Sequence, residues 1–213
     1  MPPLGSPEAL VRIHGYPVST WTRTLRMTCA EKGLAYELVP VPYGSEEHGA
    51  LHPFRRIPIL EVGETVIFET LAATGYVDEA FDGPSLQPAD PARRATMRTW
   101  MGVCGDYLFR QVVRGIPRDR TPTDEELGTA REALGRAESF LGEEGGSIVD
   151  GEGASAASAF LVGDTVSLAD LYLAPQLANC CEKAPEILAE LPRLTAWLAT
   201  IEQRPSFTTT EPG

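Results

Sequence analysis

Residues 15–23 read GYPVSTWTR, and within this stretch one kind of sequence pattern gives way to another. The five residues before it, LVRIH at 10–14, are mostly apolar and β-branched, which predicts a short strand. From Thr20 onward apolar residues return at helical spacing, which predicts a helix that Gly33 ends as a C-cap glycine. The residues on that helical face are Trp21, Leu25 and Cys29. The chain is therefore expected to open with a strand, a loop and a helix.

The segment IPILEVGETVIF at 57–68 predicts two strands, over 57–62 and 65–68. Gly63 and Glu64 between them are predicted to form a hairpin turn. The helix expected after it has an apolar face of Ala73, Val77 and Phe81. Upstream of the hairpin, residues 34–41 predict another strand, and the polar residues 43–56 leave room for one helical turn. Residues 10–82 therefore read β-α-β-(α)-β-β-α.

Residues 83–91, GPSLQPADP, hold three prolines and are predicted to include a linker. We therefore expect a first domain over 1–83, a linker over 84–91 and a second domain over 92–213. Beyond the linker, strand patterns are almost absent and a long helical stripe begins. The stripe consists of Met97, Met101, Cys104 and Leu108.

Further helices are predicted in the second domain. One begins after Thr123, which together with Glu126 three residues later has the pattern of a capping box. Residues 143–160 are rich in Gly, Ala and Ser, which predicts a mobile loop. Helical patterns return at Ser167 and again over 191–201, so the second domain is expected to be all-α.

The composition excludes several kinds of protein. Of the 213 residues 43% are hydrophobic and 23% are charged, which suits a folded chain. The net charge is −12, and both sides of Gly83 are acidic, so neither side offers the clustered cations that bind nucleic acid. The four cysteines have no C-x-x-C or zinc spacing, which predicts no metal and a reduced, cytoplasmic protein. We find no secretory signal and no apolar stretch near the ~20 residues that span a membrane.

Three short segments carry residues suited to a peptide-like or anionic ligand. Ser19 begins a helix, where unpaired N–H groups, the helix dipole and a hydroxyl donor favour a thiolate; a plain N-cap is the alternative. A cis bond before Pro58 would leave the Ile57 backbone available to a ligand; an ordinary trans edge proline is the alternative. Glu69 and Thr70 open a helix and could hold both ends of an amino acid, or serve only as caps.

Taken together, these segments resemble the cytosolic glutathione transferases. The resemblance follows the order GYPVSTWTRTLRMTCAEKGLAYE, then HPFRRIPIL, then Glu69-Thr70, then a proline linker and helices. Its most specific part is FLVGDTVSLADLYLAP, where Ser167 and Asp170 occupy the family's N-terminal capping box. RPSF near the end also resembles the family, so the match covers about residues 10–207, with 143–160 as an insertion.

The resemblance implies a thioredoxin-like α/β N-terminal domain followed by an all-α helical bundle, in a homodimer. It implies glutathione as co-substrate, activated as a thiolate for transfer to a small hydrophobic electrophile, in a cytoplasmic detoxifying enzyme that transfers alkyl or aryl groups. Ser19 takes the position of the family's catalytic serine. The glutathione-binding positions fall on Arg56 for the glycyl carboxylate, Ile57 and Pro58 for the cysteinyl amides, and Glu69 and Thr70 for the γ-glutamyl end. The electrophile would lie against Met101, Cys104, Tyr107 and Leu108, a set that also reads as part of the helical core.

Departures from the family pattern leave alternatives open. Thr20, Thr22 and Tyr16 stand close enough to Ser19 to be the thiol donor instead. The serine-type start is similar to the zeta group, which suggests a glutathione-dependent isomerase, but the S-S-C run of that group is missing. A non-catalytic ligand-binding protein is a further alternative. A thiol-disulfide reductase would need a cysteine at the helix start, whereas Cys29 falls in mid-helix. The resemblance also points to a bacterial source.

Overall fold

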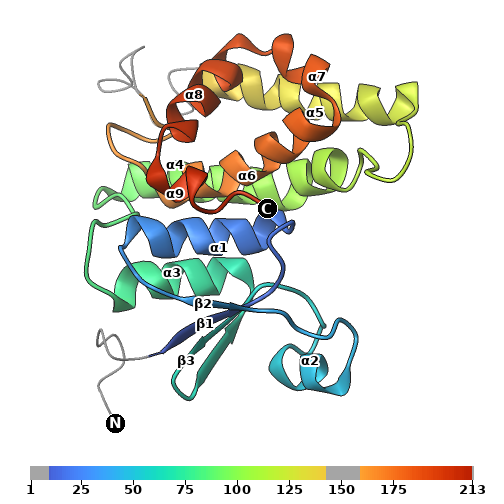
Figure 1. The fold of residues 1–213 in the computed structure, drawn as a ribbon. Helices are drawn as coiled ribbons and strands as arrows, with labels where there is room; N and C mark the ends of the chain where they lie inside the picture. The colour runs from blue at the N-terminus through green and yellow to red at the C-terminus, as the bar shows by residue number, and fades with distance from the viewer. Residues whose placement is uncertain (1–9, 143–158, 213) are drawn as a thin grey trace. The chain divides into compact units, whose positions relative to one another are not determined.

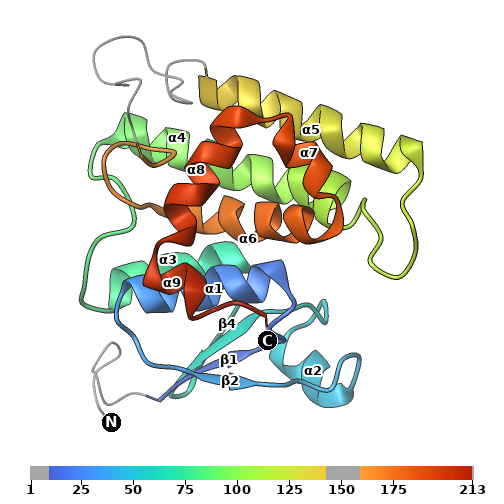
Figure 2. The same cartoon turned by 45° about the horizontal axis from the view of Figure 1, so that its top comes forward.

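The computed structural model describes residues 10–142 and 159–212. The chain forms two compact units, which are described separately. Unit 1 consists of the chain up to Ser85 together with Arg204–Gly213, and unit 2 is Leu86–Gln203. The elements of unit 1 are β1 (Val11–His14), α1 (Thr20–Glu31), β2 (Glu37–Val39), α2 (Glu46–Leu51), β3 (Ile59–Val62), β4 (Thr65–Phe68), α3 (Thr70–Ala80) and α9 (Pro205–Thr208), labelled in Figures 1 and 2.

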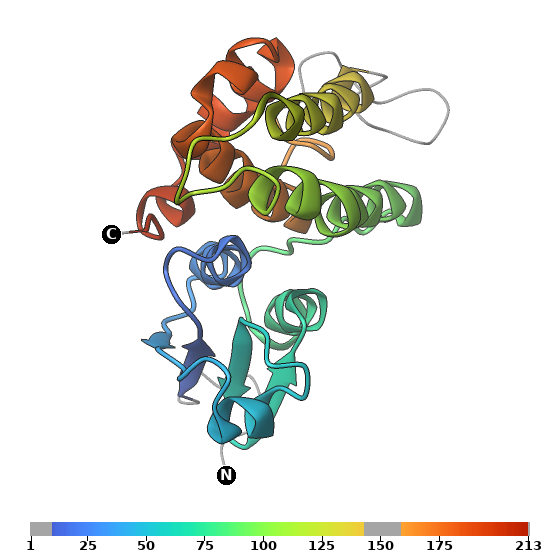
Figure 3. The ribbon, with the colours of Figure 1, turned by 90° about the vertical axis from the view of Figure 1, so that its right-hand side faces the viewer.

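The sheet of unit 1 has the strand order β2-β1-β3-β4. β1 pairs parallel with β2, whereas β3 runs antiparallel to both β1 and β4. Side chains alternate between the two faces, so Val11 and Ile13 of β1 share an apolar face with Leu60 and Val62 of β3. The helices α1 and α3 cover that face, while α2 lies apart from them (Figure 3). This is the mixed sheet expected for a thioredoxin-like domain.

Two strands are shorter than the sequence predicts by two residues or more. The second strand covers only Glu37–Val39 of the expected 34–41. At its start the Leu34 N–H bonds the Cys29 carbonyl at 2.8 Å, which closes the end of α1 instead of extending a strand. At its end Pro40 has no N–H for a ladder. β3 begins at Ile59 rather than at residue 57, since the preceding Ile57-Pro58 segment lies outside the ladder.

The C-terminal segment belongs to unit 1, although the sequence assigned it to the helical domain. Its Arg204 donates two hydrogen bonds of 2.7 Å to the Glu31 carboxylate of α1. The Arg23 guanidinium lies 4.1 Å from the ring centroid of Phe207, a cation–π contact. Polar side chains on α1 therefore find their partners in residues that are distant in sequence, and α9 lies along α1 in both Figures 1 and 2.

Among the described residues of unit 2, every regular secondary-structure element is a helix. Its elements are α4 (Pro91–Gly102), the π-helix η1 (Val103–Val113), α5 (Asp124–Gly142), α6 (Leu168–Lys183), α7 (Pro185–Ala189) and α8 (Pro192–Glu202). Together with the sheet of unit 1 this confirms the predicted fold class. α4 and η1 run on as one helical rod (Figure 2). The stripe at 97–108 predicted this helix, but apolar spacing alone did not reveal the wider π turns that begin at Val103.

Capping residues explain where the helices of unit 2 begin. The Thr123 N–H donates to the Glu126 carboxylate at 2.8 Å, and the Glu126 N–H donates to the Thr123 hydroxyl at 3.3 Å, which completes a reciprocal capping box for α5. At α6 the Ser167 N–H and hydroxyl both donate to Asp170, at 2.8 and 3.0 Å. The loop predicted for residues 143–160 falls, for residues 143–158, outside the described residues. No helix in the described parts of the chain is long and apolar enough to cross a bilayer.

Candidate functional site

The sheet register brings three predicted segments to one edge of unit 1. His14, the last residue of β1, pairs with Ile59, the first residue of β3. Ile59 pairs in turn with Phe68, the last residue of β4. Because β1 and β4 end there and β3 begins there, the loop that leads to Ser19, the Ile57-Pro58 step and Glu69 all lie at the same edge of the sheet.

Ser19 is the N-cap of α1, with φ −77° and ψ 121°. Its Oγ accepts the Thr22 N–H at 3.3 Å, so the plain capping alternative does describe its contact within the protein. Accepting this bond does not use the hydroxyl proton, which stays available for a ligand. The first turn of α1 holds no acidic residue, so nothing there opposes a bound anion.

The other hydroxyls near Ser19 are less suitable donors. The Tyr16 hydroxyl donates to the Val41 carbonyl, which commits its proton. The Thr22 hydroxyl is completely buried. Thr20 is only 6% exposed, and its hydroxyl has no partner among the described residues. Of these four residues, Ser19 alone is both partly exposed and not committed as a donor.

The peptide bond between Ile57 and Pro58 is cis. Pro58 is buried, and the ladder that joins β3 to β1 begins at the next residue. The backbone of Ile57 is therefore outside the β-ladder, at the edge where the loop to Ser19 emerges. The alternative of a trans edge proline does not describe this structure.

Glu69 precedes α3 with φ 69° and ψ 122°, a backbone conformation that residues other than glycine rarely adopt. Its side chain makes no capping hydrogen bond and stays exposed. Such a conformation persists only where the surrounding structure imposes it, and it is typical of functional positions. The capping role considered for Glu69 is therefore not observed, and its carboxylate is directed outward next to Thr70, the first residue of α3.

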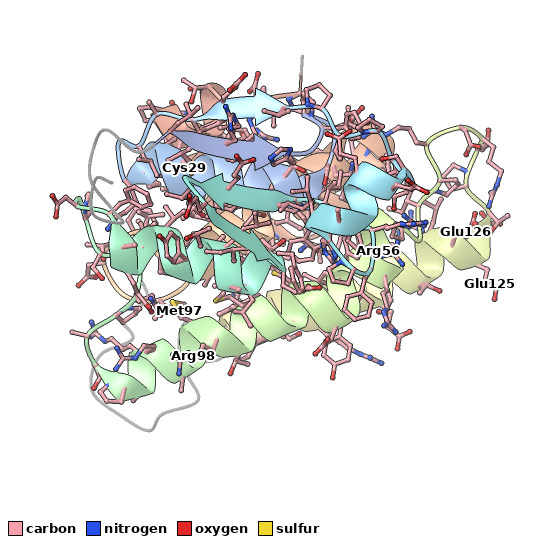
Figure 4. The ribbon with its side chains drawn as sticks, turned by 90° about the horizontal axis from the view of Figure 1, so that it is seen from below. Cys29, Arg56, Met97, Arg98, Glu125 and Glu126 are labelled. Carbon is pink, nitrogen blue, oxygen red and sulfur yellow. The ribbon has the colours of Figure 1, made fainter. Side chains whose placement is uncertain are left out.

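The loop between α2 and β3 carries two exposed arginines. Arg55 has φ 49°, and its guanidinium lies against Gly49 of α2, where an added Cβ would be 3.0 Å from Nε. Arg56 lies beside α2 (Figure 4), and its backbone carbonyl accepts a hydrogen bond of 3.0 Å from Nε2 of His48. Arg56 is thus fixed through its backbone while its guanidinium reaches solvent.

Two histidines at this loop were missed by the sequence reasoning. His48 and His52 are buried, at 0% and 1% exposure. Nε2 of His52 lies 3.9 Å from the Glu69 carboxylate, and its Nδ1 accepts the Phe54 N–H at 3.2 Å. Burial lowers the pKa of His52, although the Glu69 charge acts in the opposite direction. Their four-residue spacing, with His52 as the first residue of the HPFRRIP motif, is a signal that could have revealed them.

The residues predicted to contact an electrophile lie on α4 and η1 of unit 2. Met101, Cys104 and Leu108 are buried, whereas Tyr107 is 56% exposed. Burial raises the pKa of the Cys104 thiol far above its ordinary value, so this sulfur is an apolar surface rather than a nucleophile. Burial also raises the pKa of Cys29 to about 12, which argues against the reductase alternative.

Among the described residues, no group of three or more His, Cys, Asp or Glu side chains could hold a metal ion. The fold and this edge of the sheet define a class of protein: a thioredoxin-like domain with a cis-proline beside a helix N-terminus, followed by a helical domain. The family models described as "Glutathione S-transferase, N-terminal domain" and "Glutathione S-transferase, C-terminal domain" match residues 13–85 and 104–205.

Individual relatives agree with the family models. Glutathione S-transferase APIC of Nicotiana tabacum is 31% identical over 216 residues, which cover 92% of this chain and 95% of the relative. A maleylacetoacetate isomerase of Rattus norvegicus is 29% identical over 175 residues, 78% of this chain and 76% of the relative. The apo structure of a glutathione S-transferase III superposes with a TM-score of 0.77 at 25% identity and covers 95% of both chains. The chain belongs to the glutathione S-transferase family.

Proposed function

We propose that this protein activates glutathione as a thiolate at Ser19 and conjugates it to small hydrophobic electrophiles. The observation that carries the proposal is the register that joins His14, Ile59 and Phe68. It brings a helix N-terminus, a free backbone segment and an outward carboxylate to one edge, and a tripeptide such as glutathione has a group suited to each. The serine-type mechanism and the bacterial source expected from the sequence stay predictions.

Each part of glutathione has a partner of matching chemistry at this edge. The ammonium of the γ-glutamyl end would meet the Glu69 carboxylate, and its carboxylate would meet the N–H and hydroxyl of Thr70. The amides of the cysteinyl residue would pair with the backbone of Ile57, next to the cis Pro58. The glycyl carboxylate would meet the Arg56 guanidinium, which can bind it through two parallel hydrogen bonds.

Thiolate formation at Ser19 needs a modest amount of stabilisation. A free cysteine thiol has a pKa of about 8.5, and a shift of ~2 units corresponds to roughly 2.7 kcal/mol. A hydrogen bond from the Ser19 hydroxyl and the positive end of α1 are together of that order. The thiol proton leaves to solvent, and the sulfur lone pair then forms the new bond to the electrophile, whose leaving group departs or whose acceptor atom takes up a proton.

Replacing Ser19 by alanine tests this role. We expect the pKa of bound glutathione, measured from its thiolate absorbance across pH, to rise by about 1–2 units, with a corresponding loss of conjugation rate at neutral pH. Glutathione affinity measured by calorimetry should change little, since the other contacts remain. Ser139→Ala on the exposed face of α5 is the matched control and should leave the thiol pKa unchanged.

Two results would change the proposed donor or the proposed activity, and a third would reject the function. An unchanged thiol pKa in Ser19→Ala would move the donor role to Thr20, Thr22 or Tyr16; the hydroxyls of Thr20 and Thr22 are buried and have no partner among the described residues. Binding of glutathione without turnover of any electrophile would favour a non-catalytic ligand-binding protein. Absence of glutathione binding at millimolar concentration would reject the proposed function altogether.

The similarity to a maleylacetoacetate isomerase supports a second candidate activity. In this reaction the thiolate adds to a carbon–carbon double bond, rotation follows, and the sulfur leaves again with its electron pair, so glutathione is regenerated. An assay with a cis-configured unsaturated diketo acid separates the two candidates, because isomerisation consumes no glutathione whereas conjugation consumes one equivalent.

We further propose that the protein acts in the cytoplasm as a homodimer. All four cysteines are free thiols, which suits a reducing compartment. Phe54 exposes 72% of its surface on the loop that carries Arg56, and a second copy would remove this ring from water. Sedimentation analysis is the test, and a mass of about 23 kDa at micromolar concentration would contradict the dimer.

A further inference from the structure

His48 connects two separate segments of unit 1 through its ring. The Gly44 N–H donates to Nδ1 at 3.2 Å, and Nε2 shares a hydrogen bond of 3.0 Å with the Arg56 carbonyl. The backbone of His48 is fixed as well, because its N–H donates to the Ser45 hydroxyl at the N-cap of α2. The side chain is completely buried, so solvent does not compete for either ring nitrogen.

These partners determine the proton position on the ring. A backbone N–H can only donate, so Nδ1 must accept from Gly44. A carbonyl oxygen can only accept, so Nε2 must carry the proton that bonds Arg56. His48 is therefore a neutral, Nε2-protonated strut between the start of α2 and the loop before β3.

The rest of this loop depends on the second histidine. The His52 carbonyl accepts the Arg55 N–H at 2.8 Å, and its Nδ1 accepts the Phe54 N–H at 3.2 Å. These two bonds fix the loop only as far as Arg55. The strut from His48 is what fixes the backbone at Arg56, immediately before the Ile57-Pro58 step.

We propose that His48 is a positioning residue that gives the site its preference for a ligand with a carboxylate at the glycyl end, by holding Arg56 in place. The inference rests on the proposed function, in which Arg56 meets that carboxylate. Arginine loses much conformational freedom when it binds, and a backbone that is already fixed reduces this cost. Without the hydrogen bond from His48, the backbone of Arg56 would be ordered only when the ligand binds, and the entropy lost would make the binding free energy less favourable.

Two substitutions separate the two halves of the strut. In His48→Gln the amide nitrogen stands as far along the side chain as Nε2 and can still donate to Arg56. In His48→Asn the amide oxygen stands where Nδ1 stood and can still accept from Gly44, but nothing reaches Arg56. Both variants keep a polar group at the buried position, so they differ in the one contact that the proposal invokes.

The experiment measures binding of glutathione and of γ-glutamylcysteine, which lacks the glycyl residue, by calorimetry on the full-length protein. For the wild type we expect glutathione to bind roughly tenfold more tightly, the value of one good charge-assisted contact. His48→Asn should lose most of this preference, and His48→Gln should keep it to within about threefold. Affinity for γ-glutamylcysteine should be the same in all three proteins.

Two controls distinguish positioning from a general loss of stability. His14→Asn removes another buried histidine, which bonds Glu61 at 2.7 Å on the sheet, and should lower stability without changing the preference for glutathione. In an Arg56→Ala background, His48→Asn should have no further effect on the preference, because the two residues act through one contact.

The outcomes test the role of His48 and the proposed function separately. The role of His48 is overturned if His48→Asn keeps the wild-type preference, or if His48→Gln loses as much as His48→Asn. If the wild type binds both peptides equally, glutathione binding stands but Arg56 and His48 have no part in recognising the glycyl end. If the wild type binds neither peptide, the proposed function fails and the role of His48 fails with it.

Discussion

The carboxylate of Glu31 in α1 accepts two hydrogen bonds of 2.7 Å from the guanidinium of Arg204, a residue 173 positions later in the chain. Ser206 donates a third hydrogen bond to the same carboxylate. The Glu31 side chain is only 9% exposed, so its charge depends on these partners. Through them the end of the chain becomes part of the unit that carries Ser19.

Replacing Arg204 by alanine should destabilise the protein by about 2 kcal/mol, because it leaves a mostly buried carboxylate without its cation. Urea unfolding measures the loss, and hydrogen exchange should show faster opening of residues 205–210. Arg136→Ala is the control, since Arg136 pairs with Glu132 on the exposed surface of α5 and should contribute less than about 0.5 kcal/mol. Equal losses in both variants would contradict the importance of burial.

The same pair predicts a pH dependence of stability. Burial alone would raise the pKa of Glu31, but hydrogen bonds from Arg204 and Ser206 outweigh it and hold the pKa below its ordinary value of 4.5. A carboxyl whose pKa is lowered by folding stabilises the protein above that ordinary value, and the contribution is lost as pH falls through the folded pKa. Unfolding free energy should therefore fall below pH 4.5, and Glu31→Gln should reduce this slope. A wild-type slope in Glu31→Gln would refute the assignment.

Gly15 should not tolerate a side chain. A Cβ at this position would lie 2.5 Å from Oγ1 and 2.9 Å from Cγ2 of Thr22, which is completely buried. We expect Gly15→Ala to cost about 1–3 kcal/mol and to disturb the loop that leads to Ser19. Adding Thr22→Ala removes both clashing atoms and should recover most of the loss in a double-mutant cycle.

The control for this prediction is Gly128→Ala on α5. An added Cβ there meets no atom within 4 Å, so the change should stabilise the helix by about 0.5–1 kcal/mol. If Thr22→Ala fails to rescue Gly15→Ala, the loss arises from the backbone of the loop and not from the contact with Thr22.

Asp170 should be the most sensitive acidic residue of unit 2. Its fully buried carboxylate accepts hydrogen bonds from the Leu161 N–H, from Ser167 and from Nε1 of Trp197. Burial raises its pKa, and these donors compensate for only part of that effect. Asp170→Ala should cost about 3–5 kcal/mol or prevent folding, because several buried donors lose their acceptor at once.

Asp170→Asn keeps the size of the side chain but places an NH₂ group among donors, so we expect a smaller, still clear loss of about 2 kcal/mol in urea unfolding. Ser167→Ala, which removes one donor and leaves the carboxylate satisfied by the others, should cost about 1 kcal/mol. The loss of stability should be largest for Asp170→Ala, intermediate for Asp170→Asn and smallest for Ser167→Ala. Any other order would contradict the role of Asp170 as the common acceptor.

Local sequence patterns were sufficient for most elements of this fold. Leu25, Cys29 and Val77 lie on helical faces whose period is visible in the chain, and all three are buried. Thr123 and Glu126 cap a helix through contacts three residues apart, which a sequence can show directly. The patterns were less informative where α and π turns look alike: Cys104 and Leu108, four residues apart, predicted an α-helix but lie in the observed π-helix.

The sequence also predicted one part of the candidate site and not another. Ser19, Pro58 and Glu69 were identifiable because each stands at the junction of a strand and a helix or loop. Their convergence was not, since it depends on Ile59 pairing with both His14 and Phe68. Nor could the chain alone show that Tyr16 donates to Val41 or that His48 reaches Arg56, because such contacts depend on how loops lie against each other.

The sequence by itself therefore determined the order of elements, the two-part architecture and the membership of the glutathione S-transferase family. These follow from periodicity, caps and motifs that act over a few residues. Only the tertiary structure decided which hydroxyl near the start of α1 is both exposed and uncommitted as a donor, which side chain holds the backbone of Arg56, and to which unit the end of the chain belongs. Glu31 and Arg204 illustrate the reason: two charges far apart in sequence meet only when the chain folds and brings Arg204 to the mostly buried carboxylate of Glu31.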